Sequence, residues 1–249
     1  MKEILDKFSK QAKTYQKYRP RYPQALYDEL LSLTPERGSC WDCGTGNGQV
    51  AIELAKYFKQ VYATDISQKQ LDQAESKSNI TYKVERAEST SFPAQQFDLI
   101  TVGQAMHWFD FEGFNKEVRR VGKKGGIISI WGYGLLRINK DINALIDHFY
   151  TDIIGPYWNK ERKHVDTAYQ SITFDFEELK PKQCPPIVVQ WDKAQLEGYF
   201  NSWSSVQNYL AKNKGENPVP ALMKKMDEYW EANAIKEIKF PIFMRNGII

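Results

Sequence analysis

The sequence predicts a doubly wound α/β fold, in which helices cover both faces of a mostly parallel sheet. Three observations support this prediction. Between residues 39 and 132, short apolar runs alternate with runs of helical periodicity. The helical runs are long enough to cross over between parallel strands, as right-handed βαβ units require. The first apolar run ends in a glycine-rich turn, within WDCGTGNGQV, that leads into a helical run.

Each element of the core is predicted from its own residues. Short apolar runs predict strands, and apolar residues spaced three or four apart predict helices. The expected strands are Ser39–Cys43, Gln60–Thr64, Ile80–Val84, Phe97–Val102 and Gly126–Trp131. The expected helices between them are Val50–Phe58, Gln68–Lys77 and Phe111–Val121. Because strands and helices alternate, the sheet is expected to be parallel.

Helical segments precede this core. Phe8, Ala12 and Tyr15 fall on one face of a helix, and two prolines interrupt the chain before a second helix, Gln24–Leu33. Residues 1–36 are therefore expected to form an N-terminal helical cap, and residues 37–132 the ligand-binding core.

The remainder of the chain, residues 133–249, is expected to add lid helices and to complete the sheet. The expected elements are a helix near residues 138–150, a strand at Ile187–Trp191, and helices at Gln195–Phe200, Ser205–Ala211 and Pro220–Trp230. Ile235–Met244 alternates apolar with polar residues, as a half-buried strand does, before the letters NGII. The 249 residues are expected to form one domain with a substantial core.

The composition excludes several classes of protein. Hydrophobic residues make up 42% and charged residues 26% of the chain, as in globular proteins and not in disordered ones. The net charge of +3 is too small to indicate a nucleic-acid partner. No apolar run reaches the ~18 residues that span a bilayer, and MKEILDKFSK does not resemble a signal peptide. We therefore expect a cytoplasmic protein with neither nucleic acid nor membrane as partner.

The cysteines raise the question of a metal or redox site. Cys40 and Cys43 form a C-x-x-C pair, but zinc usually takes four ligands. The chain offers only Cys184 and three widely spaced histidines besides. An odd number of cysteines also argues against a disulfide framework. We therefore expect no metal, and the pair is typical of a buried strand end.

The glycine-rich turn predicts a ligand site. Gly44, Gly46 and Gly48 alternate along it, and glycine permits positive φ and close approach of the backbone to a ligand. Glycine-rich turns also serve simple close packing, which is the alternative interpretation. A dinucleotide fingerprint would require glycine at position 49, where Gln49 stands, so a nicotinamide-dependent dehydrogenase is disfavoured.

A carboxylate follows the next expected strand. Asp65 lies 21 residues after Gly44, where a carboxylate can accept hydrogen bonds from both hydroxyls of a ribose. Alternatively, Asp65 could cap the following helix, a role that Ser67 could also fill. The spacing from the glycine-rich turn favours the ribose, with an unphosphorylated 2′ position.

With these motifs the sequence resembles the class I S-adenosylmethionine-dependent methyltransferases, in the type 11 branch that includes trans-aconitate methyltransferase-like enzymes. The matching segments are D-C-G-T-G-N-G at 42–48, D-I-S-x-x-Q-L-x-x-A at 65–74, A-E at 87–88 and F-D-L-I-x-x-x-Q-A-x-H-W-F at 97–109. Y-x-x-Y-R-P-x-Y-P at 15–23 and G-Y-F-N-S-W-S at 198–204 also match, so the resemblance covers nearly the whole chain.

The resemblance implies a Rossmann-like sheet of seven strands whose last strand is antiparallel. It also implies S-adenosyl-L-methionine as cofactor, with S-adenosyl-L-homocysteine as product. Asp42 and the glycine-rich turn would hold the methionine part, and Asp65 the ribose. Ile66, Ala87 and Glu88 would surround the adenine. The full set of cofactor-binding residues that the resemblance implies is Tyr15, Arg19, Asp42, Gly44, Thr45, Gly46, Gly48, Asp65, Ile66, Ala87, Glu88 and Gln104.

The segment QAMHWF, residues 104–109, is expected beside the reacting methyl group. Gln104 would line the floor beneath the sulfonium, and Tyr15 and Arg19 would close the cap. His107, with an ordinary pKa of about 6.5, could act as general base for a phenol or an amine. With an acceptor that is already ionised, His107 would only orient it, and it could also be purely structural.

The methyl acceptor is expected to be a small molecule, and the family suggests a carboxylic acid that becomes a methyl ester. Guanidinium groups bind carboxylates through paired hydrogen bonds, and Arg19, Arg21 and Arg137 are the candidates. Trp108 and Trp131 are candidates for the wall of the acceptor site or for plain packing.

Two other interpretations stay open from sequence alone. One is an RNA or protein methyltransferase, although the place of an N/D-P-P-Y-like motif is taken by Q-A-M-H at 104–107. The other is a protein that binds S-adenosylmethionine without catalysis. The oligomeric state, monomer or homodimer, is not predicted.

Overall fold

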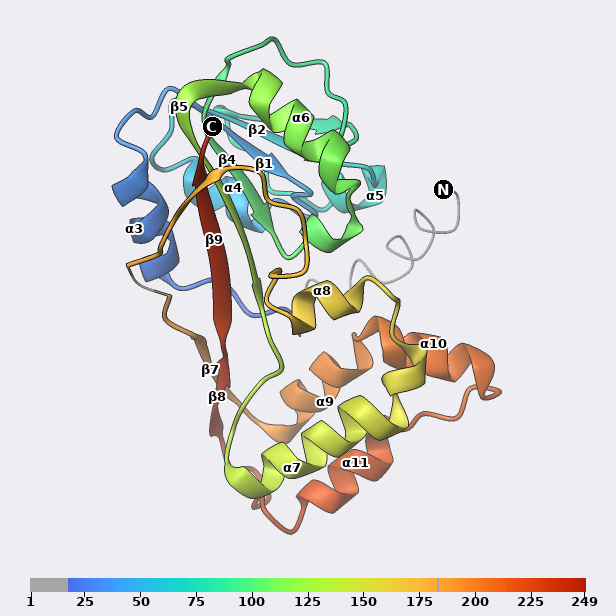
Figure 1. The fold of residues 1–249 in the computed structure, drawn as a ribbon. Coiled ribbons are helices and arrows are strands. Elements are labelled where there is room, and N and C mark those ends of the chain that lie inside the picture. The colour runs from blue at the N-terminus through green and yellow to red at the C-terminus, as the bar shows by residue number, and fades with distance from the viewer. Residues whose placement is uncertain (1–17, 183) are drawn as a thin grey trace.

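A seven-stranded sheet forms the centre of the computed structural model, which describes residues 18–182 and 184–249 (Figure 1). Its strands are β1 (Ser39–Cys43), β2 (Gln60–Asp65), β3 (Ile80–Val84), β4 (Phe97–Gly103), β5 (Gly122–Tyr133), β6 (Glu177–Leu179) and β9 (Ile242–Ile248). Strands β7 (Ile187–Trp191) and β8 (Lys236–Phe240) form a separate two-stranded sheet. The helix expected through Tyr15 lies outside the described residues.

The helices predicted within the described residues appear in the predicted order, with some differences in length, whereas the helix at Arg162–Asp166 was not predicted. They are α3 (Gln24–Leu33), α4 (Gln49–Leu54), α5 (Gln68–Leu71), α6 (Phe111–Val121), α7 (Lys140–His148), α8 (Arg162–Asp166), α9 (Lys193–Asn201), α10 (Ser204–Lys212) and α11 (Val219–Met226). Helices α3 and α6 have the predicted bounds, whereas α4 and α5 end earlier than predicted and continue as turns. Helix α9 begins with a capping box between Asp192 and Gln195.

The order of the strands is β3-β2-β1-β4-β5-β9-β6. The pairs among β1 to β5 are parallel, and β9 runs antiparallel between β5 and β6. This confirms the doubly wound fold with seven strands and an antiparallel last strand. The chain changes direction across the sheet between β1 and β4, and ligands bind in the crevice at such a switch point.

Helices cover both faces of the sheet. On one face, Leu30 of α3 and Leu54 of α4 belong to the same buried cluster as Cys40. On the other face, Phe114 of α6 belongs to a cluster with Cys43. The two cysteines lie three residues apart in a strand and therefore point to opposite faces. Burial raises the pKa of both thiols. Within residues 18–182 and 184–249, no cluster of three His, Cys, Asp or Glu side chains is placed to hold a metal.

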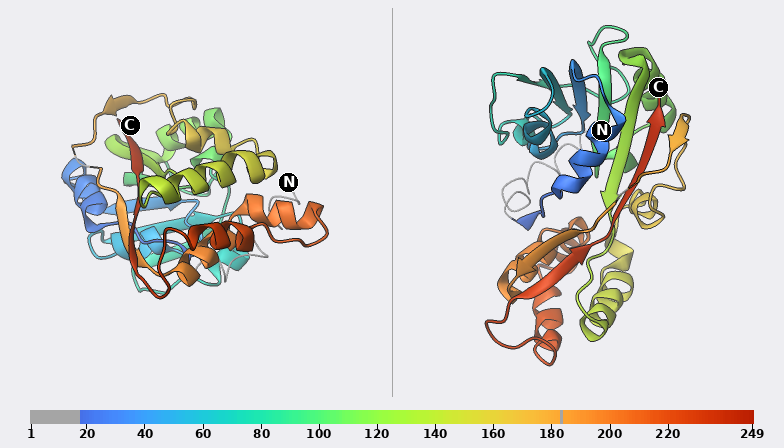
Figure 2. Two further views of the ribbon diagram at one scale, coloured as in Figure 1. Left: turned by 90° about the horizontal axis from the view of Figure 1, so that it is seen from below. Right: turned by 90° about the vertical axis from the view of Figure 1, so that its left-hand side faces the viewer.

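A second layer lies beyond the carboxyl edge of the sheet. It consists of α7, α9, α10, α11 and the β7–β8 pair, and we call it the lid layer (Figures 1 and 2). It has a buried core of its own, which includes Ile146 of α7, Phe200 of α9 and Leu222 of α11. Strands β5 and β9 belong to the sheet and extend from it toward this layer, as the right-hand view of Figure 2 shows.

The C-terminal strands differ from the prediction. Ile235–Met244 was expected to be one strand, but Pro241 separates β8 from β9. Proline has no N–H to donate to a ladder, so it favours a break at this point. Strand β9 therefore starts later and includes Asn246 and Gly247, which were expected to follow it. Strand β7 does not join the main sheet, because it pairs with β8.

None of the helices in the described part of the chain is both long and apolar enough to cross a bilayer.

Candidate functional site

A cavity of about 540 Å³ opens at the carboxyl edge of the sheet. Residues at or just after the carboxyl ends of all five parallel strands line it, and we call it the cofactor cavity after the ligand that the family resemblance implies. The predicted site residues that line it are Arg19, Gly44, Thr45, Gly46, Asp65, Ile66, Ala87, Glu88, Gln104 and Trp108. The predicted residue Tyr15 lies outside the described residues.

The three glycines of the turn serve different purposes, although all have positive φ. A Cβ on Gly44 would lie 2.6 Å from the Cβ of Ala105, and one on Gly48 would lie 2.5 Å from the hydroxyl of Tyr82. These two positions need glycine because of protein packing. Gly48 also does not line the cavity. A Cβ on Gly46 would meet no protein atom within 4 Å, and Gly46 lines the cavity. Only Gly46 fits the prediction that the turn leaves space for a ligand.

Asp65 holds the turn in place and still faces the cavity. Its Oδ2 accepts a hydrogen bond from the backbone N–H of Gly46 at 2.9 Å, and its Oδ1 accepts one from Ser67 at 2.9 Å. Burial raises the pKa of Asp65, and these two hydrogen bonds oppose that effect. Each carboxylate oxygen can accept a further hydrogen bond. The two interpretations from the sequence are therefore compatible, since one side chain can support the local backbone and also bind a ligand.

Asp42 was expected to touch the ligand, but the structure places it behind the turn. It is 1% exposed and is absent from the lining of the cavity. Its carboxylate accepts hydrogen bonds from the hydroxyls of Thr45 and Thr101. Burial raises the pKa of Asp42 to about 6. Its contact with Thr45, which does line the cavity, makes Asp42 a support for the turn.

Apolar and acidic side chains form the wall that was predicted for the adenine. Ile66 and Val84 are 36% and 48% exposed, although both are large apolar residues, because they face the open cavity. Glu88 accepts a hydrogen bond from the backbone N–H of Asp110 at 3.1 Å and pairs with Arg86 at 3.1 Å. The wall thus combines apolar surface with a carboxylate whose position is fixed.

A second, smaller cavity of about 100 Å³ adjoins the first. It contains part of the segment 104–109 that is expected beside the reacting methyl group, and we therefore call it the acceptor chamber. Five residues line both cavities and form what we call the neck: Arg19, Gln70, Gln104, Trp108 and Tyr133. The other lining residues of the chamber are His107, Gly134, Leu135, Trp158, Asn159, Arg162, Tyr199, Ser202, Trp203 and Ser204. The described residues that line the chamber therefore include two arginines, Arg19 and Arg162, and no carboxylate.

The neck is held by specific contacts. Gln104 has a left-handed φ of 58°, and its side-chain amide bonds both the N–H and the carbonyl of Tyr133 at 3.3 Å. The hydroxyl of Tyr133 accepts a hydrogen bond from Nη1 of Arg19 at 2.6 Å. The hydrogen of that hydroxyl has no protein acceptor among the described residues, so it is available to a ligand at the neck.

His107 lies in the chamber as a neutral side chain. Its Nδ1 is 3.0 Å from the hydroxyl of Tyr169, and its ring lies 4.9 Å from that of Trp108. Burial lowers the pKa of His107 to about 3, and the charges of Arg162 and Arg19 contribute to this shift. A histidine with such a pKa is a weak base, which argues against the predicted role as general base.

Three predicted acceptor-binding residues lie elsewhere. Arg21 is exposed and lines neither cavity. Arg137 forms an ion pair with Asp147 at 2.6 Å. Trp131 is fully buried below Gly103, where a Cβ would lie 3.2 Å from the indole ring. These positions were predicted from residue type, and residue type alone does not distinguish a cavity wall from a surface or a core.

Several lining residues were missed by sequence reasoning. Tyr133 was one of them, although it ends β5, and the end of that strand was a signal that could have pointed to it. Tyr199, Ser202 and Trp203 belong to the matching motif at 198–204, but no role was assigned to them. Arg162 stands in the charged run KERKH, which is typical of a solvated surface.

Known proteins are similar to this chain in both sequence and fold. A family model described as a methyltransferase domain matches residues 41–130. A Dictyostelium discoideum protein that is named as a methyltransferase is 34% identical over 246 residues, which cover 96% of this chain and 93% of that protein. A solved structure from Anaeromyxobacter dehalogenans, described as a type II methyltransferase, is 34% identical with a TM-score of 0.84 and covers 93% of this chain and 98% of that chain.

The chain belongs to the class I S-adenosylmethionine-dependent methyltransferases. Phosphoethanolamine N-methyltransferase 2 of Haemonchus contortus, solved with S-adenosyl-L-methionine, shares the fold at 17% identity and a TM-score of 0.53, over 99% of this chain and 59% of that chain. Because the chain belongs to this family, its cofactor is S-adenosyl-L-methionine.

The cavity of this methyltransferase fits that cofactor. Its volume of about 540 Å³ is within the usual range for small-molecule sites. The open space at Gly46, the carboxylate of Asp65 and the exposed apolar surface of Ile66 follow one another along its wall. These features suit an amino acid, a ribose and a purine in turn.

Proposed function

We propose that this methyltransferase transfers a methyl group to a small carboxylic acid and forms a methyl ester. The observation that carries the proposal is the acceptor chamber, which two arginines line without any carboxylate among its described residues. A buried positive potential favours an anion and disfavours a protonated amine. The volume of about 100 Å³ suits a small molecule.

As part of the same proposal, we assign cofactor-binding roles to residues that line the cofactor cavity. The open face of Gly46 would accommodate the methionine part of S-adenosylmethionine. The remaining lone pairs of Asp65 would accept hydrogen bonds from the ribose hydroxyls. Ile66 would pack on the adenine, with Ala87 and Glu88 beside its edge, and all three residues line the cofactor cavity.

When bound, S-adenosylmethionine supplies a methyl group activated by attachment to a positively charged sulfur. The task of the protein is to bring the acceptor oxygen to the neck in line with that group. Alignment of two reactants can contribute about 7–11 kcal/mol to lowering a barrier. The hydroxyl of Tyr133 would donate a hydrogen bond to the acceptor carboxylate, because Arg19 donates to its oxygen and leaves its hydrogen available. Gln104 keeps the backbone of Tyr133 in position.

This reaction needs no general base. A carboxylate is already ionised near neutral pH, so its oxygen attacks without losing a proton. The neutral state of His107, whose pKa is lowered to about 3, agrees with this requirement. His107 would donate or accept a hydrogen bond inside the chamber and shape its wall together with Trp108.

The test is a product assay with the whole protein. S-adenosylmethionine would be incubated with pooled carboxylic acids, phenols, amines, tRNA and peptides, and products that have gained one methyl group would be identified by mass spectrometry. The expected product is a methyl ester, which alkali hydrolyses back to the acid. Methylation of an amine, RNA or peptide in place of an acid would contradict the proposal. Binding of the cofactor without any product would favour a non-catalytic protein.

A further inference from the structure

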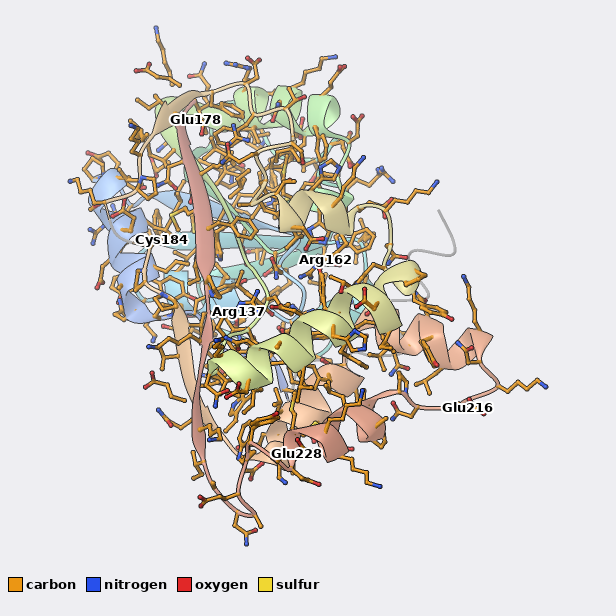
Figure 3. The ribbon with its side chains drawn as sticks, turned by 60° about the horizontal axis from the view of Figure 1, so that its bottom comes forward. Arg137, Arg162, Glu178, Cys184, Glu216 and Glu228 are labelled. Atoms are coloured by element: carbon orange, nitrogen blue, oxygen red, sulfur yellow. The ribbon has the colours of Figure 1, made fainter. Side chains whose placement is uncertain are left out.

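Arg162 is a partly buried cation with no role in the motifs of the family resemblance. It begins α8, and its side chain is 21% exposed. It lines the acceptor chamber but not the cofactor cavity. Figure 3 shows Arg162 beside α8, between the sheet and the lid layer, and Arg137 apart from it near α7. Burying a guanidinium is costly unless partners compensate its charge.

Only the Nε edge of this guanidinium has hydrogen-bond partners among the described residues. Its Nε donates to the hydroxyl of Tyr150 at 2.8 Å and to Oδ1 of Asp166 at 3.2 Å. The rings of Trp158 and Tyr150 pack near the guanidinium, with centroids 4.8 Å and 5.5 Å from Cζ. Among the described residues, neither terminal nitrogen of Arg162 makes a hydrogen bond or an ion pair. These contacts orient the side chain and leave its two-nitrogen end for a ligand.

The surroundings of Arg162 favour an anion at that end. No carboxylate belongs to the described lining of the chamber. Trp158 also lines the chamber, and its buried indole N–H has no hydrogen-bond partner among the described residues. A guanidinium and an indole N–H are both donors, so a ligand that satisfies them must offer acceptor oxygens.

We propose that Arg162 binds an anionic group of the acceptor other than the group that is methylated. We infer this from the proposed function and from the position of the neck. The reacting oxygen must be at the neck, where the two cavities meet, but Arg162 lines only the chamber beyond it. An acceptor that reaches both places carries one acidic group at each end. A guanidinium matches such a group because its terminal nitrogens can bind both oxygens of a carboxylate. The methyltransferase therefore prefers diacids to monoacids of the same length.

The test measures binding and does not depend on turnover. The protein loaded with S-adenosylhomocysteine is titrated with succinate and with butyrate, which differ by one carboxylate. Fluorescence reports binding because Trp108, Trp158 and Trp203 line the chamber. Wild-type protein is expected to bind succinate at least about tenfold more tightly, as one hydrogen-bonded charge pair is worth about 1.5–3 kcal/mol. Arg162→Gln should reduce this preference to about twofold or less.

Arg137→Gln is the matched control, because it removes an arginine that pairs with Asp147 outside the chamber, and it should keep the full preference. If Arg162→Gln does not unfold cooperatively, Arg162→Lys decides the question. It keeps the charge but loses the paired nitrogens, and it should lose most of the preference.

An equal affinity of the wild type for both acids, or a preference that survives in the variant that folds, overturns the proposal. The outcome can be separated from failure of the proposed function. If the variant loses the preference but the wild type esterifies no acid, Arg162 is confirmed as an anion-binding residue and the proposed reaction fails. If esters form and the preference survives substitution, only the role of Arg162 fails.

Discussion

Gly46→Val is expected to weaken binding of S-adenosylmethionine while the protein still folds. The new side chain would meet no protein atom within 4 Å of its Cβ, so it would project into the cofactor cavity. Overpacking a filled site costs about 1–3 kcal/mol, which corresponds to a loss of affinity of about 5- to 150-fold. The left-handed φ of 59° adds a cost of at least about 1–2 kcal/mol to the stability of the protein itself. Calorimetric titration with the cofactor measures the first effect, and thermal unfolding the second.

Gly125→Val separates these two effects. Gly125 also has a left-handed φ, of 78°, and open space at its Cβ, but it does not line the cofactor cavity. The control variant should therefore be destabilised by a similar amount and should bind the cofactor like the wild type. If Gly46→Val binds the cofactor within twofold of the wild type, or if Gly125→Val loses as much affinity, residue 46 does not face the bound cofactor.

Three further substitutions test the supports of the site. Asp65→Ala should weaken binding of S-adenosylmethionine about tenfold or more, because hydrogen bonds to a charged group are lost, and wild-type affinity in calorimetry would contradict the ribose role. The pKa of Asp42 is raised from 3.8 to about 6 by burial, so its protonation stabilises the folded protein fully below 3.8, and this stabilisation is lost as the pH rises through about 6. Asp42→Asn should therefore remove up to about 3 kcal/mol of the change in unfolding free energy between pH 4 and pH 7, as measured by urea titration, and an unchanged pH dependence would exclude this role. His107→Asn should keep kcat within about threefold of the wild type on a carboxylic acid, whereas a loss of about a hundredfold or more would identify His107 as a general base.

The fold could be predicted from sequence to the extent that local patterns determine it. Strands β1 and β3 and helix α6 have the bounds that their apolar patterns predicted. The errors come from information that is not local. The residues of Ile187–Trp191 do not indicate by themselves that this strand pairs with β8 and not with the main sheet. The break at Pro241 was visible in the sequence, but the alternation on both sides concealed it.

The cofactor cavity was predicted better than the acceptor chamber for a physical reason. Most predicted residues that line the cofactor cavity follow directly after strands. Parallel strands bring their carboxyl ends to one edge, so position in the sequence implies position in space. Besides Arg19 and Gln70, the chamber is lined by residues from the segments 104–108, 133–135, 158–162 and 199–204. The segment 158–162 leads into α8, and the segment 199–204 belongs to the lid layer. The placement of both segments depends on tertiary packing. Arg162 illustrates the difficulty, since only the fold distinguishes it from its exposed neighbours.

The electrostatics of the two cavities connect the proposed acceptor with the cofactor. The sulfur of S-adenosylmethionine carries a positive charge, and Arg19 lines both cavities while Arg162 lines the adjoining chamber. Like charges disfavour one another more strongly in a buried site than in water. The proposed anionic acceptor would lie between them and offset this repulsion, whereas a cationic amine would add to it. Burial and the same arrangement lower the pKa of His107 and keep it neutral. A protonated His107 would be a further cation beside Arg19 and Arg162, with no carboxylate among the described lining residues to compensate it. The cationic lining is thus unfavourable for an empty chamber and favourable for one that holds an acid.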